Sequence, residues 1–494
     1  MKKILILITF FLIINAEELE KNKNITISTF KTIETLNKGI KRDFYINKYF
    51  KEDITKDEAL KALSFVDNFT NEMFYNFAKK FNHDETLAVA QCMNMKREEL
   101  LSSYADCIVN GFSLEDISTL SAVDLELIKQ KTEDKYPTFT KRLKVFSSSI
   151  PFTKLIILEK NEFYNIYLNV DDDFRAKYFD YKLPKRTFQK IFKDKKNFEK
   201  FLQISITDLR LKRLQKSLIE IDDSKLDDNS SFLLALNAIR FNELSKAMIY
   251  LDNVKEKTNN KKVVDKILFW KYQITTDKKY LNELLNSNSL NLYSLYVREF
   301  SNKESIDLSF LQRINEFDSL LEKYDINRVS LLYSLAKVKS NFEVNKISEN
   351  FEIGIMQLNY KLISSLSSSS TLFLDNQKLD SFSIENNLKL ANLHINNIEK
   401  KTTNPIFSTL IYEGNNKYLN KKLKSGLFST KSTNSMFEPF LSLELISNKK
   451  KEYLKDILMY KYLYQNHLTK KSKEKITLSS IFENLSVPYQ KLGE

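Results

Sequence analysis

Residues 335–359 read LAKVKSNFEVNKISENFEIGIMQLN, a helical start that runs through a polar loop to a glycine turn. On a helical wheel the apolar side chains fall on one broad arc: Leu331, Leu332, Leu335, Ala336, Val338 and Phe342. Lys339 lies inside this arc. Because a buried unpaired charge is costly, Lys339 must extend to water, pair with Glu343 one turn along the helix, or line a cleft.

The whole chain is poor in turn-forming residues. Only six of its 494 residues are Gly and six are Pro, too few for the frequent turns of a β-sandwich. Amphipathic helical patterns fill residues 25–320, for example 58–81, 113–131 and 230–254, and helix pairs recur at 231–252 and 262–285. The sequence therefore predicts an all-α fold that begins with a long, irregular α-solenoid without a fixed-period consensus.

The net charge of +13 would suit an anionic partner. Acidic residues nevertheless alternate with the lysines and no tight arginine patch is present, so we expect no nucleic-acid site. The three histidines, His83, His394 and His467, are far apart in the sequence. They form no ligand-spaced cluster, and neither a metal site nor a cofactor is expected.

The first residues have the pattern of a secretory signal peptide. Lys2 and Lys3 precede the apolar run Ile4–Ile14, and the small residue Ala16 follows it. The run is shorter than the ~20 residues that span a membrane, and no cysteine is near for lipid attachment. We expect residues 1–16 to be cleaved and the protein to be exported without a stable membrane anchor.

Cys92 and Cys107 are the only two cysteines. An oxidising compartment would allow them to pair. Either a disulfide between two antiparallel helices or two buried thiols fits the sequence.

The pattern changes after about residue 320. Three of the six glycines, Gly354, Gly414 and Gly426, fall within one 73-residue window, which indicates an irregular structure such as a cleft. Residues 469–494 lose their periodicity, and we expect a partly ordered tail.

The segment 335–359 resembles the signature of soluble lytic transglycosylases, A-R-x-E-S-x-F followed by S-x-x-x-x-x-G-L-M-Q. The matching residues are Ala336, Ser340, Phe342, Ser348, Gly354, Met356 and Gln357. Three further blocks resemble the family in the right order, with Phe382, Asn387 and Leu388, then Tyr412 and Gly414, then Glu444 and Tyr453. The resemblance implies an α-superhelical domain over 17–320, a goose-type lysozyme-like transglycosylase domain over 321–468, and a periplasmic location.

In that family a glutamate protonates the bond between N-acetylmuramic acid and N-acetylglucosamine, and a 1,6-anhydro ring closes. Lys339 occupies the position of this glutamate. An amine of ordinary pKa ~10.4 is too weak an acid and carries the wrong charge for a cationic transition state. The family's asparagine after the signature tyrosine is Glu413 here, a family glycine is Asn415, and a usual proline is Ser447. Either Lys339 and Glu413 form an ion pair across the old cleft, or Glu413 has become the acid.

Three functions remain open on this evidence. The resemblance favours a catalytically impaired homologue that binds peptidoglycan glycan strands, with Ser340, Met356, Gln357, Tyr412 and Glu444 as substrate-binding residues. The second is an active murein lytic transglycosylase that uses a relocated acid such as Glu413. The third is a protein-interaction scaffold that contacts other cell-wall proteins and no glycan.

Overall fold

The computed structural model describes residues 30–81, 84–301, 306–369, 382–402, 404–427, 437–446, 448–469 and 477–478. The predicted signal peptide and nearly all of the predicted tail lie outside these residues. Within the described part the extended structure is limited to one isolated bridge and two two-residue strands, β1 (Glu352–Ile353) and β2 (Leu358–Asn359). The predicted all-α class is confirmed.

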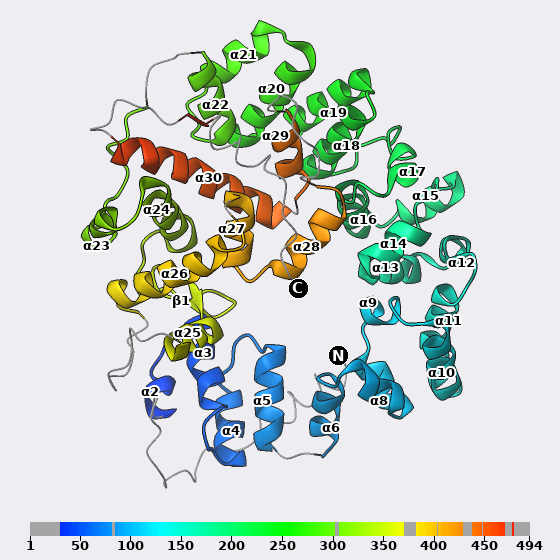
Figure 1. Ribbon diagram of the computed structural model, residues 1–494. Helices are drawn as coiled ribbons and strands as arrows, with labels where there is room; N and C mark the ends of the chain where they lie inside the picture. Colours follow the sequence, from blue (N-terminus) through cyan, green and yellow to red (C-terminus); the bar gives the residue numbers. More distant parts are fainter. Residues whose placement is uncertain are drawn as a thin grey trace. The chain divides into compact units, whose positions relative to one another are not determined.

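The chain divides into two compact units, here called the first unit (Met1–Ser147 with Asn345–Ile353) and the second unit (Ser148–Val344 with Gly354–Glu494). The predicted boundary near residue 320 stays a prediction. The helices of the first unit (Figure 1) are α2 (Phe30–Glu34), α3 (Ile40–Tyr49), α4 (Lys56–Leu63), α5 (Asn71–Phe81), α6 (Asp84–Cys92), α7 (Arg97–Ser102), α8 (Ala105–Gly111), α9 (Leu114–Ile117), α10 (Ala122–Thr132) and α11 (Pro137–Phe146).

Each of the long amphipathic stretches proves to be two helices. Residues 58–81 break between α4 and α5, where the Asp43 carboxylate of α3 accepts the backbone N–H groups of Asp67 and Asn68, each at 2.8 Å. Residues 113–131 break before Ser121, whose hydroxyl caps α10. Residues 230–254 break at Asn242, which has a φ of 60°. These caps and left-handed residues satisfy backbone groups that a continuous helix would otherwise pair.

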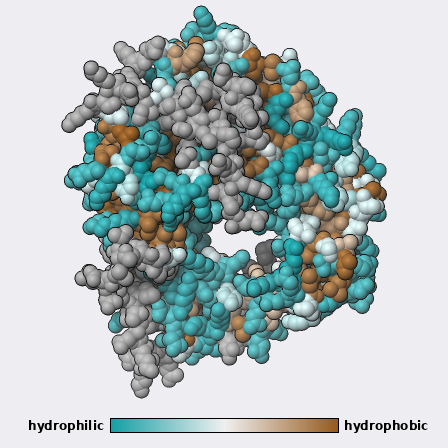
Figure 2. All heavy atoms as spheres, viewed as in Figure 1, coloured by the Kyte–Doolittle hydropathy of each residue, from teal (hydrophilic) through white to brown (hydrophobic). Residues whose placement is uncertain are grey.

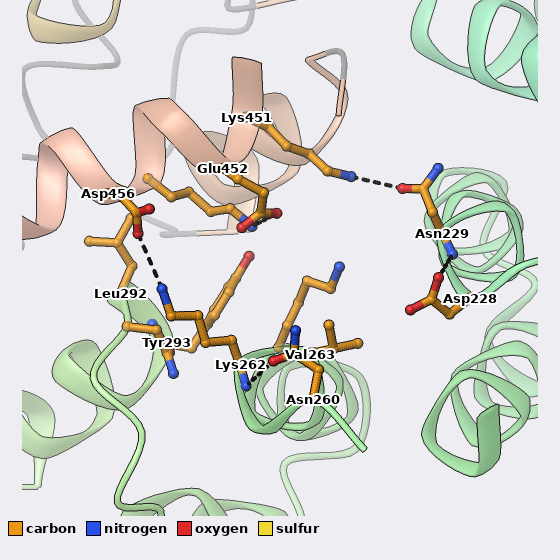
Figure 3. A pocket seen from close by; sticks show the side chains of 13 residues that line it. Asp228, Asn229, Asn260, Lys262, Val263, Leu292, Tyr293, Lys451, Glu452 and Asp456 are labelled. Atoms are coloured by element: carbon orange, nitrogen blue, oxygen red, sulfur yellow. Dashed lines mark hydrogen bonds and ion pairs between the residues drawn. The ribbon is translucent and has the colours of Figure 1, made fainter. Parts of the chain in front are cut away.

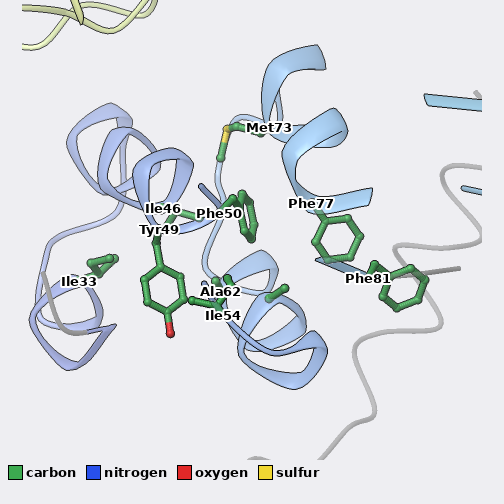
Figure 4. Close-up of a cluster of buried hydrophobic side chains, with 10 residues drawn as sticks. Ile33, Ile46, Tyr49, Phe50, Ile54, Ala62, Met73, Phe77 and Phe81 are labelled. Carbon is green, nitrogen blue, oxygen red and sulfur yellow. The ribbon is translucent and has the colours of Figure 1, made fainter. Parts of the chain in front are cut away.

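Aromatic and aliphatic side chains fill the core of the first unit (Figure 4). The ring centroids of Phe50 and Phe77 lie 5.8 Å apart, and Phe77 stacks on Phe81 at 5.1 Å. The cluster takes residues from α2, α3, α4 and α5, so the short helices depend on one another for burial. Their stability therefore comes from packing rather than from helix propensity.

Cys92, at the end of α6, and Cys107, in α8, form a disulfide. This bond decides between the two alternatives that the sequence left open. Packing is tight beside it, since a Cβ on Gly111 would lie 2.6 Å from the Cys92 carbonyl oxygen. The bond ties α6 to α8 in a region of short helices.

Removing the disulfide by replacing both cysteines with serine is expected to lower the free energy of unfolding of the first unit by about 3 kcal/mol, because the bond closes a loop of 15 residues. Thermal unfolding followed by circular dichroism, with and without reductant, measures the loss. The wild type should show no free thiol in denaturant until reductant is added. Two reactive thiols without reductant would contradict the assignment.

The solenoid part of the second unit consists of α12 (Pro151–Ile157), α13 (Lys160–Asn169), α14 (Asp172–Tyr178), α15 (Lys185–Ile191), α16 (Lys195–Thr207), α17 (Lys212–Lys216), α18 (Asp228–Arg240), α19 (Leu244–Lys257), α20 (Lys261–Thr275), α21 (Lys278–Leu285) and α22 (Leu292–Phe300). The pairs α18–α19 and α20–α21 are adjacent antiparallel hairpins (Figure 1). The predicted solenoid is confirmed.

A structural period is present that the sequence did not reveal. The N-cap residues Asp194, Asp227, Asn260 and Asn291 precede α16, α18, α20 and α22. They recur about every 32 residues, a spacing typical of helical-hairpin repeats. The repeat is visible in the caps because only they must keep a fixed residue type, while the apolar positions vary.

The remaining elements are α23 (Asn315–Asp318), the 3₁₀ helix η2 (Ser319–Glu322), α24 (Ile326–Ser340), α25 (Tyr360–Ser369), α26 (Ile384–Glu399), α27 (Pro405–Tyr412), α28 (Asn416–Lys424), α29 (Phe437–Glu444) and α30 (Asn448–Leu468). In Figure 1, α30 crosses α24 and also contacts α27 and α29. Tyr333 of α24 stacks on Tyr464 of α30 with 4.6 Å between ring centroids. This packing gives α24 a fixed base.

Hydrophilic side chains predominate on the face shown in Figure 2, and apolar ones form small groups. Among the described residues no helix is both long enough and apolar enough to cross a bilayer.

Candidate functional site

Lys339 lies in the last turn of α24. The helix begins at the N-cap Asp325, whose carboxylate accepts the backbone N–H of Arg328 at 2.9 Å. It ends where Asn341 and Phe342 adopt φ values of 53° and 64°. The apolar arc is buried as predicted for Leu331, Leu332, Leu335, Ala336 and Phe342, and the Lys339 side chain is only 4% exposed.

The Lys339 ammonium forms an ion pair with Glu413, with 3.4 Å between Nζ and Oε1. Glu413 follows α27 directly, and its other oxygen accepts a hydrogen bond from the Asn415 side chain at 3.3 Å. The predicted ion pair of Lys339 with Glu413 is confirmed. Lys339, Glu413 and Asn415 thus form one connected network.

The turn at residues 354–357 lies beside this network and depends on glycine. Gly354 has a φ of 80°, and a Cβ there would lie 2.4 Å from the side-chain nitrogen of Asn387 in α26. Both the backbone conformation and the close approach therefore require glycine. Gln357, with a φ of 49°, donates its side-chain amide to the Gly354 carbonyl at 2.7 Å and closes the turn.

Three other elements hold the same turn. The Ser340 hydroxyl of α24 donates to the Ile355 carbonyl at 2.6 Å. The Met356 N–H donates to Asn387 at 2.7 Å, and the Tyr412 hydroxyl of α27 donates to the Met356 carbonyl at 3.0 Å. Four of the predicted substrate-binding residues are thus brought together, and each one is buried and shapes the turn.

His394 was not expected at this site. Its ring lies 5.2 Å from the ring of Tyr412, and the ammonium of Lys339 lies 5.4 Å from the same Tyr412 ring. Burial and, to a lesser degree, the cation of Lys339 lower the pKa of His394 to about 4, against a hydrogen bond to the Tyr412 backbone that raises it. The imidazole is therefore neutral at pH 7.

The sequence held one signal for this histidine. His394 follows Asn387 by two helical turns on α26, so the two share a face of the helix. Its Nε2 is buried and accepts no hydrogen bond from the described part of the chain. The arrangement is a cation balanced by a carboxylate, beside a neutral imidazole and a rigid turn.

Glu444 lies apart from these residues, at the end of α29. It is fully buried, accepts a hydrogen bond from Tyr293 of α22, and pairs with Lys455 of α30 at 3.0 Å. Burial would raise its pKa, but Lys455, Lys266 and Lys451 outweigh burial and lower the pKa to about 2. Its assignment to substrate stays a prediction.

The segments that carry this geometry can be compared with known families. Residues 317–434 match the transglycosylase SLT domain. The match covers α24, the turn at 354–357, α26 and α27, so Lys339, His394 and Glu413 all lie within the SLT domain. This match agrees with the transglycosylase domain that the sequence predicts for this part of the chain. No curated protein matches the chain.

Three solved structures are similar over most of their length. The inactive E503Q mutant of the lytic transglycosylase Slt from Pseudomonas aeruginosa covers 91% of both chains at 9% identity, with a TM-score of 0.44. The complex of the 70-kDa soluble lytic transglycosylase with bulgecin A covers 91% of this chain and 89% of that one, at 11% identity and a TM-score of 0.37. Slt70 from Escherichia coli covers 88% and 87% at 10% identity, with a TM-score of 0.29.

Proposed function

We propose that this protein binds peptidoglycan glycan strands through its SLT domain and cleaves them either not at all or very slowly. The observation that supports this is the ion pair of Lys339 with Glu413 in the position where the family has its acid. We further propose that residues 1–16 direct the chain to the periplasm, that residues 17–320 form the superhelical domain, and that residues 321–468 form the SLT domain.

A lysine cannot replace the family's glutamate in the same reaction. The acid must lose a proton to the glycosidic oxygen near pH 7 and then act as a base. An ammonium also adds a positive charge where an oxocarbenium-like cation develops. Its ion pair with Glu413, 3.4 Å long, also occupies the group that would have to reach the glycosidic oxygen.

The alternative of a relocated acid places the proton on Glu413. Both of its oxygens already have partners, Lys339 on one and Asn415 on the other. A general acid needs a carboxyl oxygen within hydrogen-bond reach of the glycosidic oxygen, and here each oxygen of Glu413 contacts a protein group instead. We therefore favour a binding role, and an active transglycosylase with Glu413 as its acid is the second candidate.

A protein-interaction role without glycan would not explain why the turn at 354–357 is held so rigidly. Ser340, Asn387 and Tyr412 together fix three consecutive residues of that turn. Such a pre-organised backbone is what a ligand site needs. We propose that this turn, with Lys339 and Tyr412 beside it, contacts the glycan.

Binding can be tested by sedimentation with purified, insoluble peptidoglycan. Tyr412→Ala removes both the ring against Lys339 and His394 and the bond to Met356, and it is expected to weaken binding about tenfold, a loss of ~1.4 kcal/mol. Tyr104→Ala, which changes an exposed tyrosine of the first unit, is the matched control and should bind like the wild type. Equal binding by folded Tyr412→Ala would favour the interaction-scaffold function.

A further inference from the structure

A cavity lies where three solenoid helices begin, far from Lys339 in the sequence. It has a volume of about 260 Å³ and is lined by the first residues of α18, α20 and α22 together with α30 (Figure 3). The positive ends of three helix dipoles therefore face one space, and each of these helices is at least nine residues long. Such ends attract anions.

Four lysines add to this positive field: Lys262, Lys266, Lys451 and Lys455. Lys262 pairs with Asp456 at 3.5 Å, and Lys455 pairs with both Glu444 and Glu452. Lys451 donates to the side chain of Asn229 at 3.1 Å (Figure 3). Three of the four ammonium groups thus already have an oxygen partner in the protein.

Lys266 is the exception. It is only 7% exposed, it lines the cavity, and its ammonium lies 3.9 Å from the centroid of the Phe232 ring. Among the residues that the structure describes, no oxygen accepts a hydrogen bond from it or forms an ion pair with it. A buried lysine without an acceptor is costly, and burial lowers the pKa of this one to about 7.

The carboxylates that line the cavity do not form an ion pair with Lys266. Glu452 and Asp456 are paired with other lysines. The Asp228 side chain accepts the backbone N–H of Asn229 at 2.8 Å. Glu444, which lies behind the lining, is paired with Lys455 and Lys451.

We propose that this cavity binds a small oxyanion, a phosphate or a carboxylate, with Lys266 as its principal ligand. Lys451 and the positive ends of the dipoles of α18, α20 and α22 balance the remaining negative charge of the anion. The bound anion would connect α30 to three successive repeats of the solenoid. The site is separate from the proposed glycan site and does not depend on the SLT domain having any activity.

The test follows the thermal unfolding of the full-length protein at increasing anion concentration. Unfolding is detected by the fluorescence of Trp270, the only tryptophan of the sequence, which lies one turn after Lys266 in α20. Inorganic phosphate and acetate are titrated separately at constant ionic strength, with chloride as the reference salt. We expect saturable stabilisation of the wild type against thermal unfolding by phosphate, by acetate, or by both, and the stronger one identifies the ligand's chemistry.

Lys266→Met should weaken this binding at least tenfold. Its unfolding temperature without anion is measured as the baseline, because the substitution removes both a buried charge and one of the cations that act on Glu444. Lys261→Met removes a charge from the exposed start of the same helix, outside the cavity, and should leave the dissociation constant unchanged within about twofold.

A second measurement keeps the test valid if Lys266→Met does not fold. Acetic anhydride is added to the wild type, and acetylation of Lys266 is followed by mass spectrometry. The stabilising anion should slow this labelling at least fivefold, while the labelling of Lys261 stays constant. No saturable effect of either anion, or equal stabilisation of the wild type and Lys266→Met, would overturn the proposal.

Discussion

Lys339→Glu is expected to raise the release of 1,6-anhydromuropeptides from purified peptidoglycan by ~10²–10⁴-fold over the wild type, the usual contribution of a general acid. Mass spectrometry of the digestion products measures the change. The wild type should release no product above a blank without protein. The substitution places a carboxyl group beside the rigid turn at 354–357, the position that we propose for the acid from the resemblance of the sequence.

The expected gain depends on Glu413. A carboxyl introduced at 339 would face this carboxylate, since the present ion pair spans 3.4 Å. Two carboxylates at that distance cannot both ionise readily, so the pKa of one rises and it can act as an acid at neutral pH. Combining Lys339→Glu with Glu413→Asn tests whether the repulsion between the two carboxyl groups increases or decreases the rate of cleavage. Asparagine is the residue that the resemblance predicts at position 413.

Lys339→Gln is the matched control, because it fills a similar space without a carboxyl group and should stay inactive. Product from the wild type that disappears in Glu413→Gln would contradict the binding role and favour the relocated acid. If no folded variant releases 1,6-anhydromuropeptides, the site retains binding without the geometry for cleavage.

Glu444→Gln is expected to lower the free energy of unfolding of the second unit by about 3–5 kcal/mol, because it removes the counter-charge of buried lysines. Lys455 and Lys451 lie 3.0 and 3.7 Å from its carboxylate, and both are buried. Urea unfolding followed by the fluorescence of Trp270, which is buried in the same unit, measures the loss.

The same carboxylate makes stability depend on pH. Its pKa is about 2 in the folded protein against an ordinary 4.5, so its contribution is present above pH 4.5 and is lost as the pH falls toward 2. The linked change amounts to about 3 kcal/mol. Glu444→Gln should remove this part of the acid sensitivity.

Glu452→Gln is the matched control for this prediction. Glu452 also pairs with Lys455, at 2.7 Å, but its side chain is exposed. Exposed pairs contribute ~0–1 kcal/mol, so this variant should unfold nearly like the wild type. Equal losses from both variants would contradict the buried-charge explanation.

The sequence by itself determined the all-α class, the solenoid and the SLT domain. Apolar periodicity gives helices directly, and four motif blocks in order were enough to indicate the family. It also indicated that Lys339 needs a partner, because a charge on an apolar arc must be balanced. Glu413 could be named as a candidate partner because the resemblance predicts a gained cation at 339 and a gained carboxylate at 413, in neighbouring motif blocks.

Only the tertiary structure decided where helices break and which side chains complete the sites. The carboxylate of Asp43 ends the helical pattern after α4 by accepting N–H groups from a distant turn, and no local pattern records such a contact. His394 shares a helix face with Asn387, but no sequence motif marks either His394 or Lys266 as part of a site. They stand out only because folding buries them beside groups remote in the sequence, and the cost of burying a polar group depends on those neighbours rather than on its own position in the chain.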